Sequence, residues 1–342
     1  MNPALQAAAG LAVGFAAGFA VRRARLCSFA AIECAVTSGD TRALRAYAMA
    51  LALAIAVTQP LLALGWLQAD SIALLPQALP WAGALVGGAV FGLGMSMVGT
   101  CAFGCVVRLG SGDLRSLVVL IVFSTVAWAT MRGVLLPLRT DLLDHLAIPL
   151  ADAPAWLRPG VAAVTALGLA AWALRSRALR RSHRLIWAAV ALGGGVAAGW
   201  LVTGVWADDF EPVRPHSLSF VGPVAALVHG LMLQPLPPLD FGVGAVIGVG
   251  AGACAAGWWA GDLRWEAFDD HHEMRRQLAG AALMGVGGIL ASGCTIGQGL
   301  SAGSLLAPSW PFAALGLVAG ARLGIAILIG GGVREWLQLS NR

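Results

Sequence analysis

The strongest constraint on the fold is a break inside an apolar stretch near the C-terminal end of the chain. Residues 280–306 read GAALMGVGGILASGCTIGQGLSAGSLL. The first part suits a membrane helix, whereas the part after Ser292 is too rich in glycine and serine for a helix that faces lipid. Irregular backbone inside a membrane must line a cavity or be buried in protein. Transporters place anion and ion sites at such breaks, so Cys294, at the break, is a candidate site residue.

An earlier stretch repeats this pattern. Residues 91–111 read FGLGMSMVGTCAFGCVVRLGS, and alignment of Cys101 with Cys294 needs no gap. The flanking matches are Gly92 with Gly285, Gly94 with Gly287, Gly104 with Gly297, Gly110 with Gly303 and Ser111 with Ser304. Glycine is abundant in this chain, but matches on both sides of a shared cysteine favour an internal repeat. Many transporters are built from such repeats and bind their substrate between them.

The composition indicates that these breaks lie within a membrane protein. A hydrophobic content of 58%, a charged content of 11% and a mean hydropathy of +0.80 exclude a soluble globular protein. We expect an all-α membrane bundle with about nine transmembrane helices and short re-entrant helices. We expect a single integral-membrane transport domain over 1–342, with repeat halves at about 1–138 and 217–336 and a linker with extra helices at 139–216. The first residues lack a cationic region, so we expect no cleaved signal peptide.

Two further patterns concern packing and orientation. Glycines recur at every fourth position in three sets, which predicts close helix contacts: Gly10, Gly14 and Gly18; Gly244, Gly248 and Gly252; and Gly316, Gly320 and Gly324. The motif GDTR at 39–42 recurs as GDLR at 112–115 and 261–264, which predicts an aspartate cap at the start of each following helix. The densest arginine run, at 175–184, is predicted to be cytoplasmic.

The cysteines carry the candidate chemistry. They lie at 27, 34, 101, 105, 254 and 294, and they form neither a CxxC pair nor a zinc-like pattern with histidine. We therefore expect no metal and no cofactor. A narrow glycine-lined passage with thiols suits a sulfur-containing anion, because backbone amides can hold the oxygens while thiols contact the sulfur.

The alternative for each cysteine is a small buried core residue. The matching breaks favour function for Cys101 and Cys294. Cys27, which follows an arginine cluster, fits either role by position alone. Packing is the favoured role for Cys34 and Cys254, and Glu33 is left open.

Three stretches together resemble the YeeE/YedE family of sulfur-compound transporters, the thiosulfate uptake proteins. They are AVRRARLCSFAA at 20–31, FGLGMSMVGTCAFGCVVRLGSG at 91–112 and RRQLAGAALMGVGGILASGCTIGQGLSAGSLL at 275–306. The resemblance implies a bundle of two pseudo-symmetric halves whose short helices dip toward an hourglass-like centre. It implies a multi-pass protein of the bacterial inner membrane that takes up thiosulfate or a related sulfur anion.

The same resemblance assigns roles to residues. One cysteine from each stretch, namely Cys27, Cys101 and Cys294, would form a relay that contacts the anion transiently by S–H···S hydrogen bonds. It also implies a separate small sulfur-carrier protein of the sirA-like type as a partner. This chain departs from the family pattern with GTC where GGC is more usual, and with the extra thiols Cys34 and Cys105.

Two other classes of function remain open at this stage. One is an enzyme, a membrane thiol or persulfide oxidoreductase or sulfurtransferase, which the lack of a cofactor motif disfavours. The other is a structural subunit of a larger membrane complex. We expect a transporter and not an enzyme.

Overall fold

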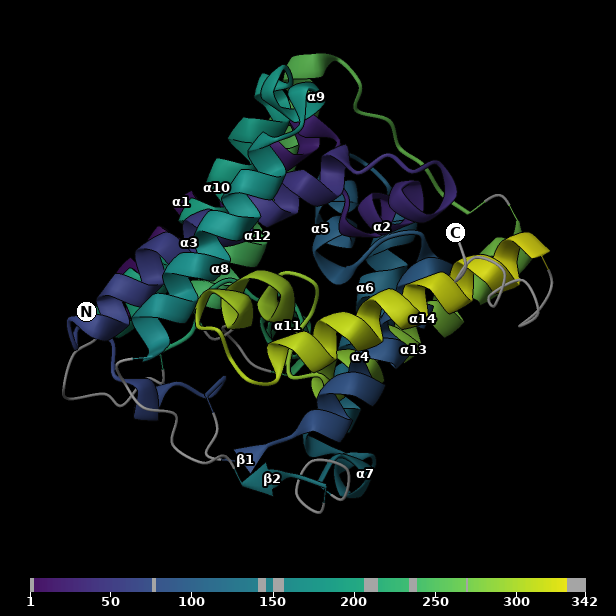
Figure 1. The fold of residues 1–342 in the computed structure, drawn as a ribbon. Helices are drawn as coiled ribbons and strands as arrows, with labels where there is room; N and C mark the ends of the chain where they lie inside the picture. The colour runs from purple at the N-terminus through teal and green to yellow at the C-terminus, as the bar shows by residue number, and fades with distance from the viewer. Residues whose placement is uncertain are drawn as a thin grey trace.

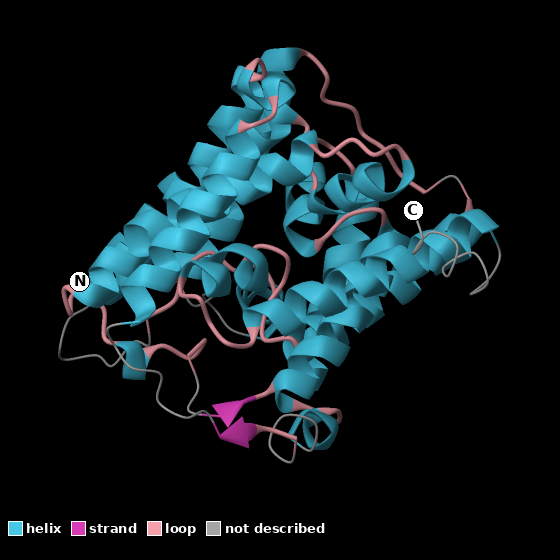
Figure 2. Ribbon diagram, viewed as in Figure 1, coloured by secondary structure: helices cyan, strands magenta, loops and turns pink. Residues whose placement is uncertain are grey.

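The computed structural model describes residues 3–75, 78–140, 146–149, 157–205, 215–233, 239–268 and 270–330. Almost all of the regular structure in these ranges is helical, as predicted, and the two short strands form a single antiparallel pair (Figure 2).

The first half of the chain contains α1 (Pro3–Ala24), α2 (Ser28–Thr37), α3 (Arg42–Ala63), the 3₁₀ turn η1 (Ala69–Ser71), β1 (Ala78–Leu79), α4 (Trp81–Val98), α5 (Ala102–Gly110), α6 (Leu114–Arg132) and α7 (Leu136–Thr140). The rest contains β2 (Ile148–Pro149), α8 (Leu157–Leu174), α9 (Arg177–Arg180), α10 (His183–Trp200), the π-helix η3 (Leu201–Val205), α11 (Gly222–Leu233), α12 (Phe241–Ala260), α13 (His271–Leu290), the π-helix η4 (Gly297–Ala302) and α14 (Trp310–Gly330).

The long helices form two groups with short helices between them. Figure 1 shows α1, α3, α8, α10 and α12 in one group and α4, α6, α13 and α14 in the other. The short helices α2, α5 and α11 lie between these groups. The short helices, and not the long ones, therefore lie at the centre of the molecule.

Seven helical segments among the described residues are long and apolar enough to cross a membrane. The sequence predicted about nine, and the difference lies in two segments. Residues 217–234 were expected to span, but α11 has 12 residues and rises only about 18 Å. Helix α8, in the predicted span 158–174, is likewise apolar but shorter than the seven. The last predicted residues of the second repeat half, 331–336, lie outside the described residues.

Glycine seams hold the long helices together. A Cβ added at Gly14 would lie 2.2 Å from the carbonyl oxygen of Ala245, and one at Gly248 would lie 2.2 Å from that of Leu11. Helices α1 and α12 therefore contact each other backbone to backbone, as the glycine spacing predicted. Helices α4 and α14 meet in the same way, since a Cβ at Gly320 would lie 1.9 Å from the Ala89 oxygen.

The aspartate caps form at two of the three predicted places. Asp40 accepts a hydrogen bond from the Arg42 amide at the start of α3, and Asp113 accepts one from the Arg115 amide at the start of α6. The Arg42 side chain also hydrogen-bonds Asp40 and holds the pKa of that carboxyl below its usual value. The prediction is wrong for Asp262, which starts no helix and instead pairs with Arg22 at 3.1 Å.

Candidate functional site

The three candidate cysteines share one local backbone conformation. Each lies two residues after a residue with a left-handed φ: Arg25 at 51°, Gly99 at 81° and Ser292 at 57°. Each cysteine carbonyl then accepts the amide four residues on, at 2.9 Å for Cys27, 2.9 Å for Cys101 and 2.7 Å for Cys294. The left-handed residue ends one helix and the cysteine begins the next helical segment. The three cysteines therefore occupy equivalent positions, each at the start of a helical segment.

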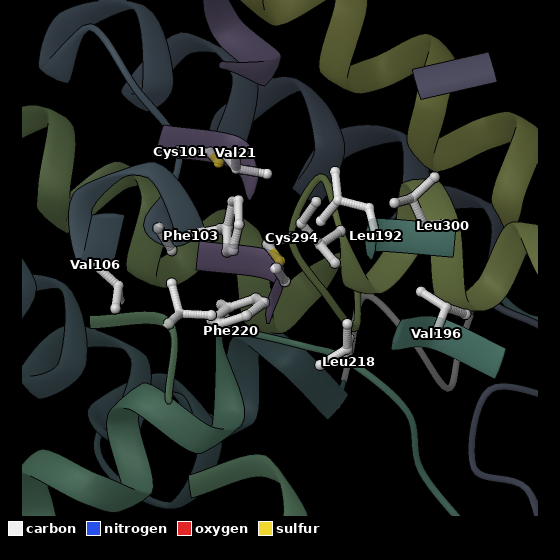
Figure 3. Packing of buried hydrophobic residues seen from close by; sticks show 14 of the residues in the cluster. Val21, Cys101, Phe103, Val106, Leu192, Val196, Leu218, Phe220, Cys294 and Leu300 are labelled. Atoms are coloured by element: carbon white, nitrogen blue, oxygen red, sulfur yellow. The ribbon is translucent and has the colours of Figure 1, made fainter. Parts of the chain in front are cut away.

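The thiols gather at the centre of the molecule. Cys101 and Cys294 are buried, and Cys27 is half-buried. Cys101 lies within electrostatic range of both other thiols. Figure 3 shows Cys101 and Cys294 in one packed cluster with Phe103 and Phe220, whose ring centroids are 4.8 Å apart. The Cys294 thiol accepts from the Gly297 amide at 3.4 Å, which leaves its own S–H free to donate.

Hydroxyl groups surround these thiols, and the sequence analysis missed them. Thr100 Oγ1 lies 3.4 Å from Cys27 Sγ, and Ser28 donates to Thr295 Oγ1 at 3.2 Å. The hydroxyls of Ser28 and Thr295 both approach the Cys101 thiol. The signal was in the sequence, because each of the three cysteines has a serine or threonine as its direct neighbour.

Two buried oxygen atoms beside the cluster have no hydrogen-bond partner in the described part of the chain. One is the Tyr47 hydroxyl, which lies within electrostatic range of all three thiols; the Ser28 hydroxyl is close to it but outside hydrogen-bonding geometry. The other is Oε1 of Gln298, whose Nε2 donates to the Ala291 carbonyl at 2.6 Å. Unsatisfied buried polar atoms are costly, and both of these residues line the first cavity described below.

Two cavities meet at the Cys27–Ser28 pair. Ser28 lines a cavity of about 350 Å³, together with Tyr47 and Thr295, and no charged side chain is among the described residues that line it. Cys27 and Thr100 line a second cavity of about 420 Å³ on the other side. Ser28 and Thr295 thus face a neutral cavity and Cys27 and Thr100 a charged one, whereas the buried Cys101 and Cys294 line neither.

We call the second cavity the arginine vestibule. Its charged lining consists of Arg22, Arg25, Arg108, Arg115 and Arg264 together with Asp113, Asp262 and Glu266. The three carboxylates are all paired, Asp262 with Arg22 and the other two with Arg115. Arg25, Arg108 and Arg264 have no carboxylate partner within the described ranges, so the vestibule is positive and attracts anions.

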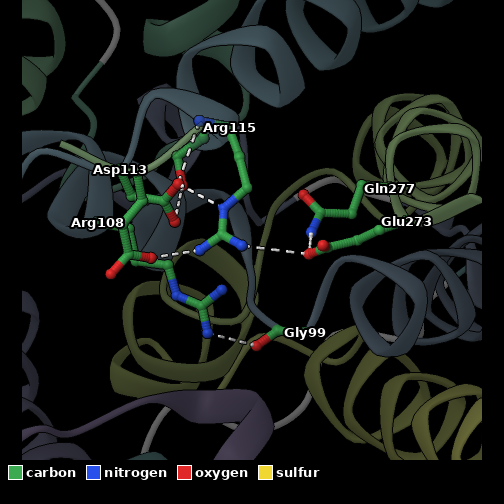
Figure 4. A network of polar contacts seen from close by, with 8 residues as sticks. Gly99, Arg108, Asp113, Arg115, Glu273 and Gln277 are labelled. Atoms are coloured by element: carbon green, nitrogen blue, oxygen red, sulfur yellow. Dashed lines mark hydrogen bonds and ion pairs between the residues drawn. The ribbon is translucent and has the colours of Figure 1, made fainter. Parts of the chain in front are cut away.

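One wall of the vestibule is fixed by a polar network centred on Arg115 (Figure 4). Its guanidinium contacts Asp113 at 3.0 Å, Glu266 at 2.5 Å and Glu273 at 3.4 Å. Gln277 donates to Glu273 at 2.7 Å, and Arg108 donates to the Gly99 carbonyl at 3.1 Å. The network ties the α5–α6 turn to the 262–266 loop and to α13.

The remaining predicted residues do not share the turn of the three central cysteines, although Cys105 lies within electrostatic range of Cys101 and Cys27. Cys105 is buried on α5 one turn after Cys101, and Cys34 and Glu33 are half-buried on α2; none of them lines either cavity. Cys254 was expected to pack inside, but it is exposed on α12.

Comparison with known proteins identifies the family of this chain. Residues 23–323 match the family described as sulphur transport. The chain is 27% identical over 318 residues to a protein named thiosulfate transporter TsuA from Escherichia coli strain K12, covering 85% of this chain and 86% of that one. It is 26% identical to the protein of the same name from Spirochaeta thermophila, covering 88% and 93%. The chain therefore belongs to the family described as sulphur transport.

Proposed function

We propose that the chain takes up thiosulfate, or a closely related sulfur anion, through the cluster of Cys27, Cys101 and Cys294. The observation that carries the proposal is the convergence of three thiols, each in the same turn, with Cys27 lining a positively charged vestibule. The naming of two relatives as thiosulfate transporters supports the choice of substrate.

The distribution of charge supports an orientation of the path in the membrane. The vestibule lies at the end of the bundle that also carries α9 and its arginine-rich surroundings, and the positive-inside rule assigns that end to the cytoplasm. Thiosulfate would thus pass from Cys294 by way of Cys101 to Cys27 and leave through the arginine vestibule. The membrane would be the bacterial inner membrane.

Each group at the centre has a task in this proposal. A soft thiol suits the terminal sulfur of thiosulfate, and S–H groups donate weakly to it. The hydroxyls of Ser28, Thr100 and Thr295 are donors for the sulfonate oxygens. All of these donors are neutral, so the anion is held weakly enough to move on, as conduction requires. The arginines of the vestibule lie at the exit, where water screens their charge.

Helix packing supports two related halves. Helix α1 packs on α12 as α10 packs on α3, and α4 packs on α14 as α13 packs on α6. The same correspondence pairs α5 with η4 and α2 with α11. We therefore place α10 in the second half, which would begin near residue 183 and not near 217. A separate sirA-like sulfur-carrier protein stays a predicted partner on the cytoplasmic side.

Uptake of radiolabelled thiosulfate into liposomes that contain only the purified chain tests the proposal. Wild type should accumulate label, and Cys294→Ala should reduce uptake at least tenfold while the protein still inserts and unfolds at an unchanged temperature. Unchanged uptake in that variant would refute the role of the thiols.

Mass spectrometry of the same samples separates the proposal from the enzyme alternative. Transient hydrogen bonding leaves the cysteines unmodified after turnover. A persulfide or mixed disulfide that accumulates on Cys27, Cys101 or Cys294 would instead favour a sulfurtransferase.

A further inference from the structure

Two adjoining hollows lie next to the arginine vestibule, at the arginine-rich end of α1, α10 and α12. The larger, of about 660 Å³, is an apolar groove whose lining includes Phe19, Ala20, Trp187 and Val190. Trp187 is 68% exposed, so the groove lies at the outer surface of the bundle. The surface of a membrane-spanning bundle faces lipid, and a groove of this kind has the shape and chemistry to hold an acyl chain.

The smaller hollow, of about 260 Å³, is a pocket of guanidinium groups. Arg22, Arg23, Arg25 and Arg184 line it with a single carboxylate, Asp262. Asp262 is already paired with Arg22 at 3.1 Å. Arg23, Arg25 and Arg184 have no carboxylate partner in the part of the chain that the structure describes, so the pocket has unneutralised positive charge. Guanidinium groups bind phosphate oxygens with matching geometry.

The two hollows adjoin each other, because Arg23 and Arg184 line both of them. The apolar groove therefore ends in the arginine pocket. Trp259 lies beside Phe19 at the rim of the groove and is 78% exposed. Tryptophan in such a position is typical of the level of the lipid headgroups. A ligand that satisfies both parts needs an anionic phosphate at one end and a hydrocarbon chain at the other.

We infer that an anionic phospholipid binds here, with its phosphodiester on Arg23 and Arg184 and one acyl chain along Phe19 and Val190. A free phosphate would use only the pocket and leave the adjoining groove without an occupant. Basic pockets between transmembrane helices on the cytoplasmic side are suited to anionic headgroups. The inference is independent of which anion the central path carries.

Arg22 and Arg25 also line the arginine vestibule, so they are unsuitable for the test. Arg23 and Arg184 line only the lipid site and are the residues to change. The matched control is a pair of exposed arginines on α9, Arg177 and Arg180, which lie at the same end of the bundle and line neither hollow.

Native mass spectrometry of the purified full-length chain, titrated with dioleoylphosphatidylglycerol or dioleoylphosphatidylcholine, tests the site. Wild type should bind the anionic lipid more tightly than the zwitterionic one. R23Q/R184Q should weaken phosphatidylglycerol binding about thirtyfold, at roughly fivefold per guanidinium. R177Q/R180Q should change it less than threefold. Equal weakening in both double variants, or no preference for the anionic lipid, would overturn the inference.

A second variant tests the groove and separates a lipid from a free anion. Ala191→Trp fills the groove without changing charge, and it should also weaken phosphatidylglycerol binding. Inorganic phosphate at the same concentration as the lipid should not displace it. Unaltered binding in Ala191→Trp, or displacement by phosphate, would mean that the arginines form a simple anion site and would refute the lipid assignment.

Discussion

Replacement of Thr100 by valine is the sharpest test of the hydroxyl groups at the centre. The two side chains have nearly the same shape, so the change removes little besides the hydroxyl. Thr100 is buried, and among the described residues its Oγ1 hydrogen-bonds only the Cys27 thiol, at 3.4 Å. That oxygen occupies space left by Gly104, where an added Cβ would lie 1.9 Å from it. The substitution should therefore cost less than about 1 kcal/mol of stability.

The effect on transport should be larger than the effect on stability. A hydrogen bond to a charged group contributes about 1.5–3 kcal/mol. Ser28 and Thr295 remain in place and can compensate in part, so we take the lower value. About 1.5 kcal/mol corresponds to a tenfold rise in the thiosulfate concentration that gives half-maximal uptake. The maximal rate should change less, because the thiols are intact.

Concentration-dependent uptake into liposomes measures this directly. Thr100→Ser keeps the hydroxyl and should stay within threefold of wild type. Thr130→Val is the control for loss of a buried threonine hydroxyl elsewhere, since Thr130 bonds only the Val126 carbonyl of its own helix. A Thr100→Val variant with wild-type half-saturation, or one that matches Thr130→Val, would refute the proposed contact with the anion.

Three further predictions concern packing, capping and the thiols outside the cluster. Gly14→Ala should lower the free energy of unfolding by about 1–3 kcal/mol, because the added Cβ collides with the Ala245 backbone. Gly168→Ala on α8, where the added Cβ meets open space, should leave the free energy of unfolding unchanged. Thermal unfolding in detergent measures both variants. Asp113→Ala removes the cap of α6 and one partner of Arg115, so the same assay should show a loss of about 1–2 kcal/mol, and an unchanged curve would contradict the network. Cys105→Ala should keep at least half of wild-type uptake, since Cys105 lacks the left-handed turn that the three central cysteines share; a tenfold loss would place it in the path.

Much of the fold could be predicted from periodicity and composition. The helix seam between Gly14 and Ala245 follows from glycine at every fourth residue, and the breaks at Cys101 and Cys294 follow from a change from apolar to glycine-rich sequence. Length misled the prediction at 217–234, because an apolar run of sufficient length contains a helix of only 12 residues, α11.

The site was harder to predict because it depends on contacts between distant segments. No local pattern indicates that Ser28 meets Thr295, which lies 267 residues away, or that Cys27 meets Thr100. The aspartate cap predicted for the GDLR motif at 261–264 is wrong for the same reason. Asp262 of this motif pairs with Arg22 at the end of α1, and that tertiary ion pair takes the place of the local cap.

The measurement that tests the central claim most directly is thiosulfate uptake by single cysteine variants in liposomes. Cys27→Ser, Cys101→Ser and Cys294→Ser should each reduce the initial rate at least tenfold, because a hydroxyl lacks the soft sulfur contact. Cys254→Ser, at an exposed thiol far from the cluster, should transport like wild type. Wild-type rates in any of the three central variants would contradict transport through a path of three thiols.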